Sequence, residues 1–233
     1  MLLVYITVGL AIGSLINRSV AYLLRFASSV PASVQPTRYS LALWQWFKSL
    51  ASRRGSQFLA AEWPGVAVEL GAALLWAYLW QCYGLSLKFF YLAVTCSFFL
   101  LTALVDLKYR LVLNVLVFPA GIVALLIHGV PPGRETLLAL AGGMFGLLPF
   151  LLAILLKPGG IGAGDVKLAT LIGLVVGFPQ VVYALLVAVL AGGITVAILL
   201  LTRRGKLTSY MPYAPFLCLG AIMILIDVPA YWW

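Results

Sequence analysis

The chain has 233 residues, of which 64% are hydrophobic and only 9% are charged. A soluble domain carries about 25% charged residues, so this composition excludes a water-soluble globule and a disordered or collagen-like chain. The net charge is +9 and the mean hydropathy is +1.11. We therefore expect a polytopic membrane protein, whose basic residues orient the chain and meet lipid headgroups rather than nucleic acid.

Eight apolar runs predict an all-α bundle of about eight transmembrane helices, since a span needs roughly 20 apolar residues. We expect two parts: a first helix with a basic cytoplasmic loop in residues 1–63, and a seven-helix core in residues 64–233. The runs cover residues 1–24, 64–83, 89–107, 111–129, 136–156, 166–178, 180–201 and 210–228.

The basic residues are concentrated in alternate loops of this predicted topology. The loops between the other runs hold only Lys88 and Arg134, whereas most Lys and Arg residues lie in four loops: 25–63, 106–110, 157–167 and 202–209. Positive residues accumulate in cytoplasmic loops of membrane proteins. This pattern predicts that these four loops are cytoplasmic and that both the N-terminus and the C-terminus lie outside.

Two aspartates lie at the cytoplasmic ends of predicted spans. Asp106 ends the third run, and Asp165 precedes the sixth, after a glycine-rich stretch. An ionisable group in a span usually faces a cavity or a partner charge. Two carboxylates in a partly dry site would supply an acid and a base, which is the chemistry of an aspartyl protease. Two structural alternatives stay open: Asp165 as the N-cap of its helix, and Asp106 as an ion-pair partner of Lys108 or Arg110.

The surroundings of these aspartates resemble the type IV prepilin peptidase family, which comprises polytopic aspartyl proteases of the GxGD type. The GxGD tetrad is Gly162-Ala163-Gly164-Asp165, followed by Lys167, and Asn114 lies downstream of Asp106. Further segments that resemble the family, in the same order along the chain, are Ile12–Asn17, Trp63–Leu70 with Glu69, and Met211–Gly220.

The resemblance implies that the protein cleaves a short basic leader from prepilins or pseudopilins, at the cytoplasmic face of a bacterial inner membrane. It implies that Asp106 and Asp165 are the catalytic pair. Lys167 would balance the charge of the pair or bind headgroup phosphate. Expected partners are the substrate's apolar helix and membrane lipids, and proteolysis of this type uses no cofactor. The residues expected to shape the site or bind substrate are Glu69, Asn114, Gly162, Gly164 and Lys167.

Many family members also methylate the new N-terminus with S-adenosylmethionine, and they carry two CxxC pairs in the first cytoplasmic loop. Residues 25–63 contain no cysteine, so we expect no zinc site there, no metal at the site, and doubtful methylation. Glu69 would orient a methyl donor or the substrate's new ammonium group, or would pair with Arg18 or a loop cation.

Two other functions stay as alternatives. A secondary transporter would use the acids to carry protons or cations, but would place them near the midplane of two related halves. A non-catalytic secretion subunit would bind pilin-like helices without cutting them. His128 is expected to be a packing or interface residue, and two glycine clusters should allow close helix packing: Gly142-Gly143 with Gly146, and Gly192-Gly193.

Overall fold

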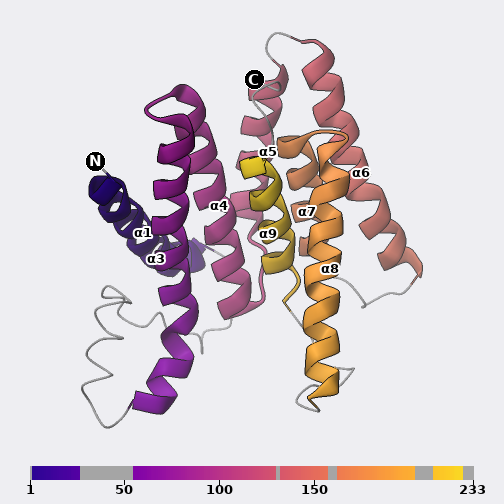
Figure 1. The fold of residues 1–233 in the computed structure, drawn as a ribbon. Coiled ribbons are helices and arrows are strands. Elements are labelled where there is room, and N and C mark those ends of the chain that lie inside the picture. Colours follow the sequence, from indigo (N-terminus) through magenta and orange to yellow (C-terminus); the bar gives the residue numbers. More distant parts are fainter. Residues whose placement is uncertain (1, 27–54, 130–131, 157–161, 203–211, 228–233) are drawn as a thin grey trace. The chain divides into compact units, whose positions relative to one another are not determined.

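The computed structural model describes residues 2–26, 55–129, 132–156, 162–202 and 212–227. All the regular structure in these ranges is helical (Figure 1), which confirms the all-α class. The eight helices found there are α1 (Leu2–Phe26), α3 (Gly55–Tyr83), α4 (Leu87–Tyr109), α5 (Asn114–Gly129), α6 (Arg134–Leu156), α7 (Ala163–Val176), α8 (Gln180–Leu201) and α9 (Ala214–Asp227).

Five of these helices are long and apolar enough to cross a membrane: α1, α3, α4, α6 and α8. The helices α5 and α9 are apolar but shorter, and α7 has only 14 residues. The set confirms a polytopic helical membrane protein. The helix boundaries follow the apolar runs to within a few residues, apart from α3, which begins nine residues earlier than expected, at Gly55.

The chain divides into two compact units, residues 1–108 and residues 109–233. Unit 1 holds α1, α3 and nearly all of α4, and unit 2 holds α5 to α9. The expected division after residue 63, between a first helix with its loop and a seven-helix core, stays a prediction.

In unit 1, α1 and α3 touch through glycines. A Cβ atom added at Gly9 would lie 2.6 Å from Ala73 Cα, and one added at Gly13 would lie 2.6 Å from Glu69 Cα. Small residues let two helix backbones approach closely where lipid leaves no hydrophobic driving force between helices. This contact brings the α1 residues after Gly13 against the buried side chain of Glu69.

An aromatic cluster joins the three helices of unit 1. Tyr5 of α1 stacks on Trp80 of α3 with ring centroids 3.8 Å apart. Phe89 of α4 meets Tyr5, Trp76 and Trp80 edge-on, a favourable geometry for aromatic rings. Trp76 Nε1 also donates a hydrogen bond to Ser97 Oγ at 3.1 Å, so α3 and α4 are joined by a polar contact as well.

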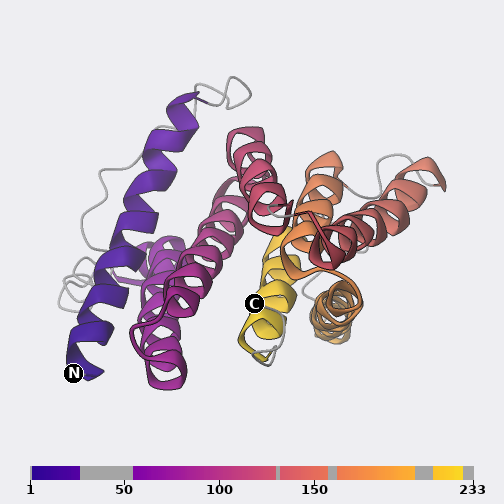
Figure 2. The ribbon, with the colours of Figure 1, turned by 90° about the horizontal axis from the view of Figure 1, so that it is seen from above.

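In unit 2, α6 and α7 are the most closely packed helices. The glycines Gly142, Gly143 and Gly146 of α6 all face α7: a Cβ on Gly142 would overlap the backbone of Gly173, and one on Gly146 would overlap that of Ala169. The expected close packing at this cluster is confirmed. Seen from above (Figure 2), α8 is viewed nearly end-on whereas α6 runs across the view, so these two helices are inclined to one another.

The second glycine cluster gives a mixed result. A Cβ on Gly192 of α8 would lie 3.1 Å from the ring of Tyr213, whereas one on Gly193 would have nothing within 4 Å. The prediction of close packing is therefore confirmed for Gly192 and wrong for Gly193. The tight contact between α8 and α9 is made elsewhere, where Gly220 meets the backbone of Ala184.

Candidate active site

Asp106 lies in the last turn of α4, in unit 1, and only 5% of its surface is exposed. The next residue, Leu107, is 37% exposed. The acidic side chain therefore points into the protein while an apolar neighbour faces outward, the arrangement expected of a functional acid in an apolar segment. Pairing of Asp106 with Lys108 or Arg110 stays an alternative prediction.

Asp165 lies in the first turn of α7, in unit 2, and is half-buried. The helix begins at Ala163 with Gly162 as its N-cap, so the alternative that made Asp165 the N-cap is wrong. Asp165 N donates to Gly162 O at 3.0 Å, within the first turn of α7. An acidic side chain three residues after the cap is typical of a capping box, and it suits the positive end of the helix dipole.

The two glycines of the tetrad, Gly162 and Gly164, each stand where a larger side chain would meet a different neighbour. A Cβ at Gly162 would lie 3.2 Å from Asp165 Oδ2, so a side chain there would press on the carboxylate. A Cβ at Gly164 would lie 2.8 Å from Val112 Cβ, in the segment between α4 and α5. The first glycine leaves room for the carboxylate, and the second lets the start of α7 pack against residues 110–113.

Lys167 and Asn114 are brought together in unit 2. Lys167 Nζ donates a hydrogen bond to Asn114 Oδ1 at 2.9 Å and lies 5.5 Å from the centre of the Phe118 ring. Both contacts are on α5, and Lys167 is two residues after Asp165 on α7. The polar contact therefore links the helix that carries Asp165 to the first residue of α5.

Tyr213 also belongs to the surroundings of Asp165. The carboxylate is close enough to interact electrostatically with the Tyr213 hydroxyl. The tyrosine ring packs against Phe150 of α6 and Phe216 of α9, with centroids 6.1 and 6.3 Å away. The sequence singled out this stretch only as a matching segment and gave no role to Tyr213.

Glu69 is buried in α3, in unit 1, with 1% of its surface exposed. Its Oε1 atom accepts a hydrogen bond from Asn17 Nδ2 at 2.8 Å, and Asn17 Nδ2 also donates to Gly65 O at 3.2 Å. Arg18, which the sequence suggested as a partner of Glu69, is exposed, and pairing of Glu69 with Arg18 or a loop cation stays a prediction. The signal for Asn17 was available, because a polar residue in a span needs a partner and both residues lie close to the same loop.

The predicted site residues thus fall into two groups. Asp106 and Glu69 lie in unit 1, whereas unit 2 holds the other five. Within unit 2 the structure brings together Asn114 with Lys167, and Gly162 with Asp165. The meeting of the two aspartates in one site stays a prediction. The five residues in unit 2 are Asn114, Gly162, Gly164, Asp165 and Lys167.

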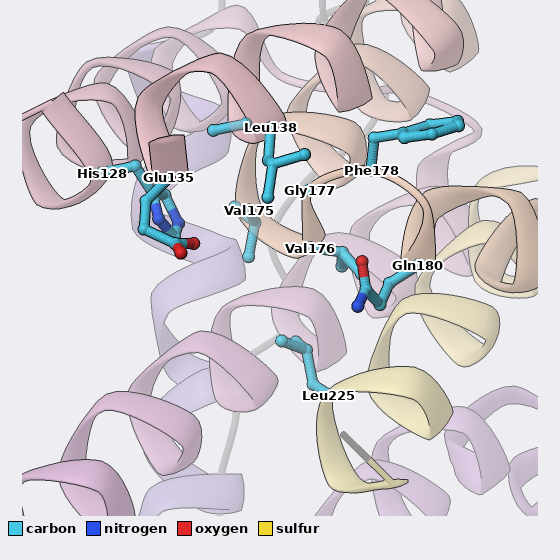
Figure 3. A pocket seen from close by; sticks show the side chains of 10 residues that line it. His128, Glu135, Leu138, Val175, Val176, Gly177, Phe178, Gln180 and Leu225 are labelled. Atoms are coloured by element: carbon cyan, nitrogen blue, oxygen red, sulfur yellow. The ribbon is translucent and has the colours of Figure 1, made fainter. Parts of the chain in front are cut away.

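A pocket lies at the other end of α7 from Asp165, lined by residues of α5, α6, α7 and α9 and by the turn before α8. Figure 3 shows the His128 and Glu135 side chains on one side of it and Gln180 on the other, with Leu138 and Leu225 among the apolar lining residues. None of the predicted site residues lines this pocket.

Comparison with known proteins finds a match that covers the end of unit 1 and most of unit 2. Residues 93–197 match the model of the type IV leader peptidase family. This match assigns the segment to the family. It is also similar to the prepilin leader peptidase/N-methyltransferase of Bacillus subtilis (strain 168), with 34% identity over 160 residues. That alignment covers 67% of this chain and 63% of the relative. No solved structure matches significantly.

The segment that matches the type IV leader peptidase family contains both aspartates and the four unit 2 residues that surround Asp165 in the predicted site. It begins within α4, thirteen residues before Asp106, and ends within α8. Glu69 and its partner Asn17 lie before it. The family match therefore includes both aspartates, whereas the Asn17–Glu69 contact lies outside the matched segment.

Among the residues that the structure describes, no group of three or more His, Cys, Asp or Glu side chains could hold a metal ion. No disulfide joins the cysteines within the described ranges: Cys82 is exposed, and Cys96 and Cys218 are buried. Most of residues 25–63, the stretch in which the absence of cysteine led us to expect no zinc site, lies outside the described residues. The expectation that the site holds no metal stays a prediction.

Proposed function

We propose that this protein is a membrane aspartyl endopeptidase that removes the basic leader peptide from type IV prepilins or pseudopilins. The observation that supports it is the placement of Asp165. This aspartate stands in the first turn of a short helix, with Gly162 leaving room for its carboxylate, inside a segment that matches the leader peptidase family. Asp106, buried at the end of an apolar helix in the same segment, would be the second carboxylate.

The proposed chemistry divides two roles between the carboxyl groups. One carboxylate takes a proton from a water molecule, whose oxygen attacks the carbonyl carbon of the scissile peptide. The other, protonated, polarises the carbonyl oxygen, and a proton then passes to the leaving nitrogen as the C–N bond breaks. The products are a leader with a new carboxylate and a mature chain with a new amine. A coupled pair titrates as a unit, so neither Asp106 nor Asp165 is assigned as the first base.

The proposed site faces the cytoplasm of a bacterial inner membrane. The loops rich in Lys and Arg adjoin the ends of α4 and α7 that carry the two aspartates, and such loops are cytoplasmic by the positive-inside rule. A pilin-like substrate would place its apolar helix among the spans and its leader at the cytoplasmic surface. The peptide just before that helix would unwind, since a closed helix hides its carbonyl groups.

Proteolysis by paired aspartates requires no cofactor in this proposal. Methyl transfer to the new N-terminus is a separate activity, which the name of the Bacillus subtilis relative includes. S-adenosylmethionine would be its methyl donor. The first loop of this chain has no cysteine, so the proposal is restricted to cleavage, and methylation is left as an outcome of the experiment.

The test is co-expression with a prepilin whose basic leader ends in glycine, followed by intact mass measurement of the substrate. The variants are Asp106→Asn and Asp165→Asn, each of which keeps the shape of the side chain and removes its charge. Asp227→Asn is the matched control, because Asp227 is exposed at the end of α9.

We expect the wild type and the Asp227 variant to remove the leader and both other variants to leave it whole. Cleavage by either of those variants would show that the paired-aspartate assignment is wrong. An intact substrate with wild type, while an authentic leader peptidase cuts the same substrate, would favour a transporter or a non-catalytic secretion subunit. A product heavier by one methylene unit would establish methylation.

A further inference from the structure

Tyr213 stands directly before α9, and contacts from three helices hold its ring in place. The ring centroid lies 6.1 Å from that of Phe150 in α6 and 6.3 Å from that of Phe216 in α9. From α8, a Cβ added at Gly192 would lie 3.1 Å from Tyr213 Cε2. The backbone is tied down as well, because Tyr213 O accepts hydrogen bonds from Phe216 N at 3.1 Å and Leu217 N at 3.3 Å.

Phe150 and Asp165 lie at the same level in the packing of α6 against α7. The backbones of these antiparallel helices meet in two successive pairs, four residues apart on each helix: Gly142 with Gly173, and Gly146 with Ala169. Residues four apart lie on one face of a helix, so the next pair in the series is Phe150 with Asp165. The Tyr213 ring packs against Phe150. Tyr213 therefore lies beside the start of α7, where Asp165 stands.

The hydroxyl group of Tyr213 is a hydrogen-bond donor in this position. The residue is half-buried, and its hydroxyl lies within electrostatic range of the Asp165 carboxylate. No residue in the described ranges forms a hydrogen bond with this hydroxyl. A phenol with an ordinary pKa of about 10 is protonated at neutral pH, and a neighbouring carboxylate favours the protonated form further. The O–H group is therefore available to a molecule bound beside Asp165.

Packing alone accounts for the ring of Tyr213 but not for its oxygen. The ring contacts with Phe150, Phe216 and Gly192 involve apolar atoms, and a phenylalanine would make the same contacts. Partial burial of a hydroxyl that has no hydrogen-bond partner lowers stability rather than raising it. A role toward a bound molecule explains the oxygen, and a role in stability does not.

We propose that the Tyr213 hydroxyl donates a hydrogen bond to the carbonyl oxygen of the scissile peptide and is a further catalytic residue. This inference rests on the proposed function, because the carbonyl belongs to the peptide that Asp165 would help to hydrolyse. Negative charge develops on that oxygen when water attacks the carbonyl carbon, and a fixed donor aimed at it stabilises the transition state. Tyr213 keeps its proton throughout, so it adds a donor to the protonated carboxyl group and leaves the proton transfers to the aspartates.

The first test is Tyr213→Phe, which removes the hydroxyl and keeps the ring. Tyr183→Phe is the matched control, because Tyr183 lies on α8 and is 58% exposed. Steady-state cleavage of a prepilin by the full-length protein gives kcat and KM, and thermal unfolding confirms that each variant is folded. We expect kcat of Tyr213→Phe to fall by at least about tenfold with KM nearly unchanged, since the donor acts in the transition state. Tyr183→Phe should match wild type.

Two neighbouring glycines of α8 test whether the position of the ring matters. Gly192→Ala would press on Tyr213 Cε2, whereas a Cβ at Gly193 meets nothing within 4 Å. A small displacement of a catalytic group lowers the rate, so Gly192→Ala should reduce kcat by about threefold and Gly193→Ala should leave it unchanged. In a Tyr213→Phe background, Gly192→Ala should have no further effect on kcat, because the hydroxyl that it displaces is already absent.

The outcomes separate this proposal from the proposed function. If wild type cleaves, Asp165→Asn does not, and Tyr213→Phe retains the wild-type kcat, the role of Tyr213 is wrong and the paired-aspartate assignment stands. A loss confined to KM would also overturn the catalytic role. If wild type leaves whole a prepilin that an authentic leader peptidase cuts, the proposed function and the role of Tyr213 are both wrong.

Discussion

Lys167 donates a hydrogen bond from Nζ to Asn114 Oδ1 at 2.9 Å, and this contact ties the first two turns of α7 to the first residue of α5. The same ammonium group lies over the ring of Phe118. Asp165 is two residues earlier on α7. In unit 2, therefore, the position of Asp165 depends on a polar contact between two helix starts as well as on the packing of Gly164 against Val112.

Loss of this contact should lower cleavage without removing the catalytic groups. We expect Lys167→Ala and Asn114→Ala each to reduce kcat for leader cleavage by about tenfold, because a hydrogen bond to a charged group contributes roughly 1.5 to 3 kcal/mol. The double variant should be little worse than either single variant, since both remove the same contact. Steady-state cleavage of a detergent-solubilised prepilin provides the measurement.

Asn114→Asp is the control for this pair, because a carboxylate at position 114 still accepts from Lys167. It should keep most of the activity. A positioning role would be contradicted if the two losses in kcat multiplied in the double variant. It would also be contradicted if kcat were unchanged in Lys167→Ala, Asn114→Ala and the double variant. An effect on KM alone would instead indicate that Lys167 or Asn114 contacts the substrate directly.

The helices were largely predictable because hydropathy determines which segments a membrane can hold. Every apolar run corresponds to a helix of the structure, with boundaries displaced by a few residues. The main departure is the start of α3 at Gly55, where the first ten residues include Ser56, Gln57 and Glu62. These residues lower the hydropathy of the segment but do not prevent an α-helix, so an apolar run marks the membrane-spanning part of a helix rather than its full length.

The contacts of the site were less predictable than the helices. The tetrad identified Asp165 from the sequence. Residue type favours aspartate over glycine as an N-cap, but the backbone angles make Gly162 the N-cap of α7. The partners of Lys167 and Glu69 lie 53 and 52 positions away in the chain. Contacts between residues so far apart in the chain depend on which helices pack together. A single sequence carries no direct signal of that packing.

The second glycine of the tetrad should be sensitive to a single added methyl group. A Cβ at Gly164 would lie 2.8 Å from Val112 Cβ, so Gly164→Ala must displace the start of α7 or the 110–113 segment. We expect a loss of about 1 to 3 kcal/mol in the free energy of unfolding, as for other overpacked sites. Thermal or denaturant unfolding in detergent measures this.

Gly193→Ala is the matched control for this substitution, since a Cβ there meets nothing within 4 Å and alanine favours a helix. It should be neutral or slightly stabilising. Val112→Ala removes Val112 Cγ2, which would lie 3.1 Å from the added methyl group, but keeps Val112 Cβ, so it should restore only part of the stability lost in Gly164→Ala. Equal stability of the Gly164 and Gly193 variants would show that the start of α7 tolerates the displacement.

The polar contact between α3 and α4 can be measured by a double-mutant cycle. Trp76 Nε1 donates to Ser97 Oγ at 3.1 Å. We expect an interaction free energy of about 0.5 to 1.5 kcal/mol between Trp76→Phe and Ser97→Ala, the range for a hydrogen bond between neutral groups. The variants Trp76→Phe, Ser97→Ala and the double variant complete the cycle, with unfolding in detergent as the readout. Additive effects would show that the contact contributes nothing to stability.

The predicted orientation of the chain can be tested with its own cysteines. Cys82 is exposed at the end of α3, whereas Cys96 and Cys218 are buried. If the loop after α3 lies outside, a membrane-impermeant maleimide added to intact spheroplasts should label Cys82, and Cys82→Ser should abolish the labelling. The variant Leu85→Cys, made in a Cys82→Ser background, places a thiol in the same loop at a residue that is 67% exposed. Labelling of both thiols only after the membrane is opened would reverse the topology and move the aspartate-bearing ends of α4 and α7 to the outer face.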